Sequence, residues 1–200
     1  MSFETDRAEH SLEMHLPYIY YTLAARASNS QLIPLVPILI GSTTPDSEKV
    51  FGGILAPYLA DRSNVFVISS DFCHWGTRFN YTYYLTSLAT SVAHGQNLSD
   101  KARPNYPPIH ESIQRIDYSA IEAICSGSHD VFLRNLKDTG NTVCGRHPIG
   151  VIMAAIESLK EEGKLQKDKG LFKFVRYTRS SDVVEGSSSS VSYASAFAVL

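Results

Sequence analysis

Residues 64–76 read Asn-Val-Phe-Val-Ile-Ser-Ser-Asp-Phe-Cys-His-Trp-Gly, an apolar run that ends in a cluster of reactive side chains. The first half is a short β-branched stretch of the kind that forms a buried strand. The second half brings Asp71, Cys73 and His74 close together in the chain. Ligands bind beyond the carboxyl ends of strands in open α/β sheets, so this cluster is a candidate site. The alternative is a strand end whose Asp71 and His74 only cap a loop.

The composition is that of an ordinary globular protein, with 44% hydrophobic and 19% charged residues. We expect residues 1–200 to form a single domain. A net charge of −2 gives no electrostatic case for nucleic acid or an anionic membrane. Three irregularly spaced cysteines favour reduced thiols in a cytoplasmic or nuclear compartment. Residues 1–10 do not resemble a signal peptide, and the longest apolar run, residues 32–40, is too short to cross a bilayer.

Two apolar runs on either side of a predicted helix indicate a βαβ unit. Residues 32–40 are a strand candidate, although two prolines remove donors from its ladder. A helix over residues 44–60 begins with the Thr-Pro-Asp pattern of a capped start and should break or kink near Pro57. Residues 65–70 form the next strand. This order predicts an α/β fold with a mixed, largely parallel sheet flanked by helices.

The rest of the chain predicts further helices and two final strands. The helices cover residues 108–124, 130–137 and 149–160, each with apolar residues on one side. Strands are expected over residues 171–177 and 191–200, and these two could pair as a hairpin.

Residues 141–150, Asn-Thr-Val-Cys-Gly-Arg-His-Pro-Ile-Gly, form a second chemical segment. Cys144 comes just before a predicted helix, where free N–H groups and the helix dipole favour the thiolate. Arg146 and His147 add positive charge nearby. The thiolate is the form that binds a metal or attacks an electrophile. The alternative is a buried, inert cysteine, which is how we interpret Cys125.

A third polar group, Glu9, His10 and Glu13, comes before a helical stripe of apolar residues. Glu9 and Glu13 would share one helix face, with His10 beside them. His10 and His15 are too far apart for the His-Glu-x-x-His zinc pattern. The simpler interpretation is that acids near a helix start interact favourably with the helix dipole.

Three motifs together resemble the Memo family, mediators of receptor-tyrosine-kinase-driven cell motility. They are Glu-His-Ser-Leu-Glu-Met-His-Leu-Pro-Tyr over residues 9–18, Ser-Ser-Asp-Phe-Cys-His-Trp-Gly over residues 69–76, and Cys-Gly-Arg-His-Pro-Ile-Gly over residues 144–150. The resemblance covers nearly the whole chain. It implies a fold similar to the LigB-type (class III) extradiol dioxygenases, although dioxygenase activity is not an established property of the family.

The resemblance also implies a metal site. Family members bind iron or copper through two histidines and a cysteine, and the cysteine corresponds to Cys144. His74 would lie in the same pocket as a candidate acid/base, with Asp71 beside it. Further pocket or binding residues would be His10, Glu13, Arg78, Arg146 and His147. The family is also linked to redox homeostasis and to phosphotyrosine-peptide binding.

The chain departs from the family at its start. Memo proteins carry a further segment before the point that matches Met1, with both histidine ligands in a His-Ala-Gly and a Ser-His-His motif. Neither motif occurs here. We therefore expect an N-terminally truncated product, an alternative start or an incomplete gene model, holding about the C-terminal two-thirds of the family fold. Because Cys144 alone does not hold a metal well, we expect weak or absent metal binding. We also expect poor solubility or oligomerisation, from an uncovered sheet edge or apolar face.

Three function classes stay open. One is a Memo-like signalling or motility protein with phosphotyrosine-peptide or receptor signalling partners. Another is a metal-dependent redox enzyme, either an extradiol-type oxygenase or a copper-dependent generator of superoxide, with His74 as acid/base. The last is an inactive truncated fragment. None of them calls for nucleic acid or for membrane insertion.

Overall fold

The structure is a computed structural model that describes residues 3–25, 34–104 and 106–200. It divides the chain into two compact units, Met1–Gly41 and Ser42–Leu200. We call them the N-terminal unit and the main unit and describe each by itself. Whether they make up one domain stays a prediction.

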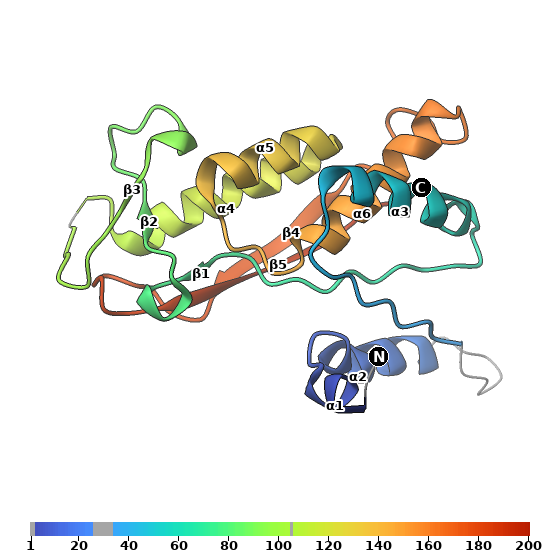
Figure 1. The fold of residues 1–200 in the computed structure, drawn as a ribbon, viewed down its shortest axis with the longest axis horizontal. Coiled ribbons are helices and arrows are strands. Elements are labelled where there is room, and N and C mark those ends of the chain that lie inside the picture. The colour runs from blue at the N-terminus through green and yellow to red at the C-terminus, as the bar shows by residue number, and fades with distance from the viewer. Residues whose placement is uncertain (1–2, 26–33, 105) are drawn as a thin grey trace. The chain divides into compact units, whose positions relative to one another are not determined.

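The N-terminal unit contains α1 (Phe3–Ala8), the short 3-10 helix η1 (Glu13–His15) and α2 (Leu16–Ala24) (Figure 1). The Glu9 carboxylate accepts hydrogen bonds from the backbone N–H groups of Ser11, Leu12 and Glu13. Together with the Ser11 hydroxyl, which makes the largest contribution, these donors lower the pKa of Glu9 to about 2. Glu9 therefore caps the start of this helical segment, in agreement with the simpler of the two interpretations.

The main unit contains four longer helices. They are α3 (Pro45–Ala60), α4 (Ile109–Cys125), α5 (His129–Thr139) and α6 (Arg146–Glu161) (Figure 1). α3 packs along α6, and α4 packs against α5. The α3–α6 contact is close because Gly52 has no side chain: a Cβ there would lie 2.8 Å from the Ala155 backbone nitrogen. Two short 3-10 helices, η2 (Thr77–Phe79) and η3 (Val92–His94), lie in the segment that connects α3 to α4.

The predicted helix starts agree well with the structure. Thr44 caps α3 and accepts a hydrogen bond from the Ser47 backbone N–H at 3.2 Å. Pro57 lies inside α3 without ending it, since the helix continues to Ala60. α6 begins at Arg146, three residues before the predicted start at Ile149. The reason is that Gly145 takes the cap position, so the residues before Pro148 already join the first turn.

The strands pair in antiparallel fashion. β4 (Lys173–Arg179) and β5 (Ser190–Phe197) form the expected hairpin, drawn in orange and red in Figure 1, and β1 (His74–Trp75) pairs with β5. β2 (Tyr83–Tyr84) pairs with β3 (Gln96–Asn97). The mixed α/β class is therefore correct. The largely parallel sheet is wrong for the described residues, in which every paired strand is antiparallel.

Two segments predicted as strands of a βαβ unit are not strands. Residues 34–40 and 65–70 carry no strand assignment, and residues 32–33 lie outside the described residues. Their β-branched composition suits an extended chain, but a strand also needs a neighbour that completes its ladder. Val65 and Val67 are 82% and 52% exposed, so this run is not covered by the rest of the described chain.

The core fixes residues 71–75 from two sides. Phe72 packs into a cluster with Phe132, Val143 and apolar residues of α4. Cys73 and Trp75 pack into a second cluster with residues of α4 and of the segment after η2. Asp71 and His74, the two polar residues of this segment, are only partly buried. Among the described residues, no helix is long and apolar enough to cross a membrane.

Candidate functional site

Asp71, His74 and Cys144 come together in the main unit. Each offers one ligand atom (a carboxylate oxygen, an imidazole nitrogen and a sulfur), and these atoms all lie within 4.8 Å of one another. His74 Nε2 lies 3.5 Å from Asp71 Oδ2. Among the described residues, Asp71, His74 and Cys144 therefore form a group that could hold a metal ion.

The position of Cys144 is set by its contacts with the segment before Phe72. The Asp71 N–H donates to Cys144 Sγ at 3.0 Å, and the Cys144 N–H donates to the Asp71 carbonyl oxygen at 3.2 Å. The next residue, Gly145, donates its N–H to Ser70 Oγ at 3.0 Å. A Cβ at Gly145 would collide with the Ser69 carbonyl oxygen, so the close approach requires glycine.

A second pair of hydrogen bonds holds His74. Its N–H donates to Thr142 Oγ1 at 2.7 Å, and the Thr142 hydroxyl donates to the His74 carbonyl oxygen at 3.0 Å. The imidazole packs beside Phe79, with ring centroids 5.1 Å apart. His74 Nε2 is buried and has no hydrogen-bond partner among the described residues. A buried nitrogen without a hydrogen bond is unusual, and beside the Asp71 carboxylate at 3.5 Å it can either carry a proton or bind a cation.

Arg78 reaches the rim of this group through Phe79. Its guanidinium carbon lies 4.6 Å from the centroid of the Phe79 ring, the ring that also contacts His74. The Arg78 side chain is exposed. Arg78 is thus an exposed cation linked to His74 only through the Phe79 ring, and its expected place as a pocket neighbour stays a prediction.

Arg146 and His147 lie in the first turn of α6, just beyond Cys144. Arg146 Nη1 donates to the Val143 carbonyl oxygen at 3.4 Å. His147 Nδ1 instead donates to Glu48 Oε1 at 2.8 Å. The expected contribution of both residues to binding stays a prediction, but the imidazole of His147 is already engaged by a carboxylate.

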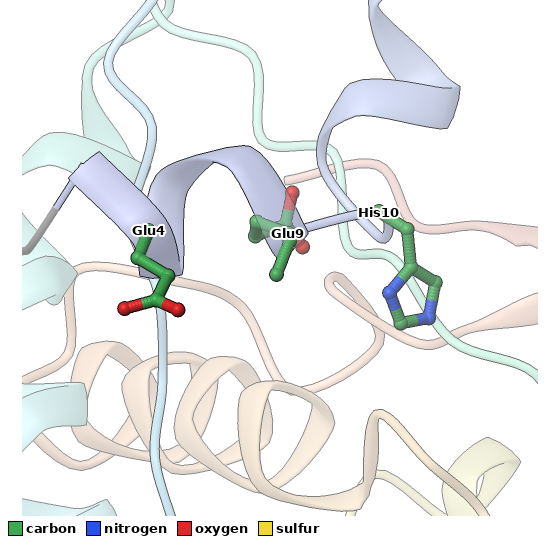
Figure 2. Close-up of a pocket in the computed structure, with 4 residues that line it drawn as sticks. Glu4, Glu9 and His10 are labelled. Atoms are coloured by element: carbon green, nitrogen blue, oxygen red, sulfur yellow. The ribbon is translucent and has the colours of Figure 1, made fainter.

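His10 and Glu13 belong to the N-terminal unit. His10 lines a hollow with Glu4, Ala8 and Glu9, and Figure 2 shows the side chains of Glu4, Glu9 and His10 there. Glu13 is exposed at the first residue of η1. Their expected place beside Cys144 stays a prediction.

Cys73, next to His74 in the chain, faces the core. It is 0% exposed. Burial, with the nearby Asp117 carboxylate, raises the pKa of the Cys73 thiol well above its usual range. The Cys73 thiol is therefore neutral and shielded, and the role of Cys144 as the reactive cysteine stays a prediction. Cys125 is partly buried against the core, and its pKa is also raised by burial.

Asp117 is an important residue that the sequence interpretation missed. It is 0% exposed in α4. Its carboxylate accepts hydrogen bonds from the Cys73 N–H at 3.1 Å, the Asn141 amide at 3.1 Å and the Tyr177 hydroxyl at 2.8 Å. It therefore ties together both segments that carry the site. The available signal was an acid in line with the isoleucines on the apolar face of a predicted helix.

Comparison with known proteins covers nearly the whole chain. The sequence model of the family described as "Memo-like protein" matches residues 1–197. The proteins named MEMO1 in Homo sapiens and Danio rerio are each 40% identical over 194 residues, which is 97% of this chain and 57% of theirs. A MEMO1 family protein of Schizosaccharomyces pombe is 40% identical over 200 residues, 99% of this chain and 62% of its own.

This chain therefore spans about three fifths of the length of the curated relatives that it matches. The match includes residues 69–76 and 144–150, the two segments that meet at the site. The chain belongs to the Memo family.

Proposed function

We propose that this chain is a metal-binding member of the Memo family, in which Asp71, His74 and Cys144 hold iron or copper. The observation that carries the proposal is the convergence of three ligand atoms within 4.8 Å. The buried Nε2 of His74, without a hydrogen-bond partner among the described residues, supports it further. About three protein ligands with open positions are typical of a reactive mononuclear site.

The three donors suit these two metals. A thiolate is a soft ligand that favours copper(I), an imidazole binds copper and iron, and a carboxylate adds a harder oxygen ligand. When bound, such a metal would supply redox chemistry. We propose weak binding, because Cys144 is exposed and Asp71 is only partly buried, so water competes for the same positions.

The ligand role and the acid/base role of His74 exclude each other at Nε2. A nitrogen that holds a metal cannot also take up a proton. Asp71 Oδ2, 3.5 Å away, is then the group placed to move a proton near the site. We therefore assign His74 to binding and Asp71 to either binding or proton transfer.

Metal binding is tested by equilibrium dialysis with iron(II) and copper(I), followed by elemental analysis. Wild type should bind weakly, approaching one ion per chain only as the metal concentration is raised, and Cys144→Ser should lower the affinity by about tenfold or more. Cys125→Ser is the matched control, since Cys125 is not one of the three possible ligands and its side chain packs against the core. If wild type retains no more metal than Cys144→Ser does, the proposal is wrong.

A second candidate function is recognition of a phosphotyrosine peptide in receptor signalling and cell motility, which the Memo resemblance implies. The supporting observation is the exposed Arg78, whose guanidinium stacks on Phe79. Arginine suits phosphate because its planar fork of N–H groups binds two oxygens at once.

Fluorescence anisotropy should detect binding of a phosphorylated peptide and not of its unphosphorylated form. Arg78→Ala should weaken binding and the exposed Arg134→Ala should not; equal effects would refute this function.

A redox enzyme would use the same metal site. Oxygen uptake with a catechol, or superoxide release by the copper-loaded protein, would support it if the signal disappears in Cys144→Ser. No turnover by metal-loaded wild type would leave binding as the function. A cytoplasmic or nuclear setting is part of the proposal, because all three cysteines are free thiols.

A further inference from the structure

Glu48, on α3, is a buried carboxylate that the proposed site does not use directly. It is 2% exposed. Its Oε2 accepts a hydrogen bond from His129 Nε2 at 2.6 Å, and its Oε1 accepts from His147 Nδ1 at 2.8 Å. The Thr43 hydroxyl also donates to Oε1, at 2.9 Å. A charge so deeply buried is tolerated only because donors surround it.

The charge state of Glu48 orients both imidazoles. Burial alone would raise the pKa of Glu48, but the hydrogen bonds from His129, His147 and Thr43 together hold it below its usual value. The carboxylate is therefore ionised and can only accept hydrogen bonds. Each imidazole must present an N–H to it, which fixes the orientation of both rings.

Glu48 contacts α6 at two places near its start. One is the side chain of His147. The other is Gly150, where a Cβ would collide with Glu48 Oε2, so the helix backbone lies directly against the carboxylate. α6 starts at Arg146, immediately after Cys144 and its neighbour Gly145. A contact that holds the start of α6 therefore also holds Cys144, which carries the ligand sulfur.

His129 extends the same contact to α5. It is the first residue of α5 and is 0% exposed. Its side chain donates to Glu48 on α3, and its backbone N–H donates to Glu157 Oε1 on α6 at 2.8 Å. The beginnings of α3 and α5 are thus both tied to α6, α3 through His147 in the first turn and α5 through Glu157 near the other end of the helix.

We infer that Glu48 is a positioning residue for Cys144 and acts through His147. This inference rests on the proposed function, because it concerns the same metal site. The Cys144 sulfur lies beside His74 and Asp71 only while the backbone of residues 144–147 keeps its place. If the Glu48–His147 contact is lost, the first turn of α6 can shift and carry the sulfur away from the other two ligands.

The test compares His147→Ala with His147→Asn and uses cobalt(II) as the probe. The asparagine amide can donate from nearly the position of the imidazole Nδ1, whereas alanine leaves Glu48 without that donor. Cobalt(II) bound to a thiolate gives a charge-transfer absorption that reports ligation by sulfur. His147→Ala should weaken cobalt(II) binding about tenfold and reduce this absorption per bound ion. His147→Asn should keep both near wild type, and Glu48→Gln should resemble His147→Ala.

Leu159→Ala controls for a general loss of stability. Leu159 is 2% exposed and packs with Ala56 and Ala155, in the same α3–α6 contact but at its other end. This variant should melt at a lower temperature and leave the cobalt signal unchanged. If it reduces the thiolate absorption as much as His147→Ala does at equal folded fraction, or if His147→Asn behaves like His147→Ala, the positioning role is overturned.

A second readout needs no metal. The rate at which iodoacetamide alkylates Cys144, measured by peptide mass mapping, reports whether its sulfur stays beside the Asp71 N–H. We expect a several-fold faster reaction in His147→Ala and a wild-type rate in His147→Asn and Leu159→Ala. If wild type binds neither cobalt, iron nor copper, the proposed function fails and the alkylation rates alone decide this inference. If wild type binds metal and every variant matches it in both readouts, only the positioning role fails.

Discussion

The Asp71 backbone N–H donates a hydrogen bond to the Cys144 sulfur at 3.0 Å, and the Cys144 N–H returns one to the Asp71 carbonyl oxygen at 3.2 Å. This reciprocal pair joins two motifs that are far apart in the sequence. The two hydrogen bonds hold the Cys144 sulfur against the backbone of Asp71, just before the start of α6. The site is therefore a property of the folded main unit and should disappear when that unit unfolds.

Gly52 and Gly53 should respond to alanine with opposite signs. Both lie inside α3, where alanine is favoured over glycine by about 1 kcal/mol. A Cβ at Gly52 would lie 2.8 Å from the Ala155 nitrogen, in the α3–α6 contact, whereas nothing lies within 4 Å of a Cβ at Gly53. Gly52→Ala should therefore lower the free energy of unfolding by about 1–3 kcal/mol, and Gly53→Ala should raise it by about 0.5–1 kcal/mol. Urea denaturation measures both, and the same sign for the two would contradict this packing.

Glu48 should make the protein sensitive to acid. Its pKa in the folded protein lies below its usual value of 4.5. Its contribution to stability is therefore present above pH 4.5 and is lost as the pH falls through the lowered pKa. The difference in unfolding free energy between wild type and Glu48→Gln should be largest above this window and shrink below it.

Urea denaturation of wild type and Glu48→Gln at a series of acidic pH values checks this expectation. The exposed Glu161→Gln on α6 is the matched control and should leave the acid profile of wild type unchanged. A difference between wild type and Glu48→Gln that stays constant across the window would show that Glu48 does not carry the effect.

Asp117 should have the opposite dependence on pH. Burial raises its pKa above the usual value of 3.8, although its hydrogen bonds, led by that with Ser192, oppose the shift. Its favourable contribution is present below pH 3.8 and is lost as the pH rises through the raised pKa. Asp117→Asn should cost about 1–3 kcal/mol, because the asparagine amide cannot accept all the donors around it. This cost should shrink as the pH rises through the window. Urea denaturation of wild type and Asp117→Asn at several pH values measures it, and a cost that grows with pH would contradict this expectation.

The exposed face of α3 should promote self-association. Val50, Ile54 and Tyr58 are 62%, 59% and 60% exposed and follow one another at helical spacing. Exposed apolar stripes of this kind favour contacts between molecules. Light scattering after size exclusion should find oligomers of wild type and more monomer for Ile54→Lys. A monodisperse wild-type monomer that melts cooperatively would contradict this expectation.

Local patterns predicted the helices well. The Thr44 cap, the helix after Cys144 and the C-terminal hairpin each depend on signals within a few residues, and each was found close to its expected place. The prediction of a strand over residues 65–70 was wrong. A strand needs a neighbouring strand to pair with, and the amino-acid composition of the segment does not show whether one is present.

The sequence predicted which residues make up the site, but not the buried hydrogen bonds behind it. Asp71, His74 and Cys144 stood out as reactive side chains in short motifs, and the structure places their ligand atoms together. Glu48 and His129 had no local signal, because their partners come from other helices. Only tertiary contacts turn such residues into a buried network.

X-ray absorption spectroscopy of the copper- or iron-loaded chain examines the ligands themselves. If Asp71, His74 and Cys144 bind the ion, the spectrum contains a sulfur neighbour together with nitrogen or oxygen neighbours, and the sulfur contribution disappears in Cys144→Ser. A spectrum with only oxygen and nitrogen neighbours, identical in wild type and Cys144→Ser, would contradict a metal site at these residues.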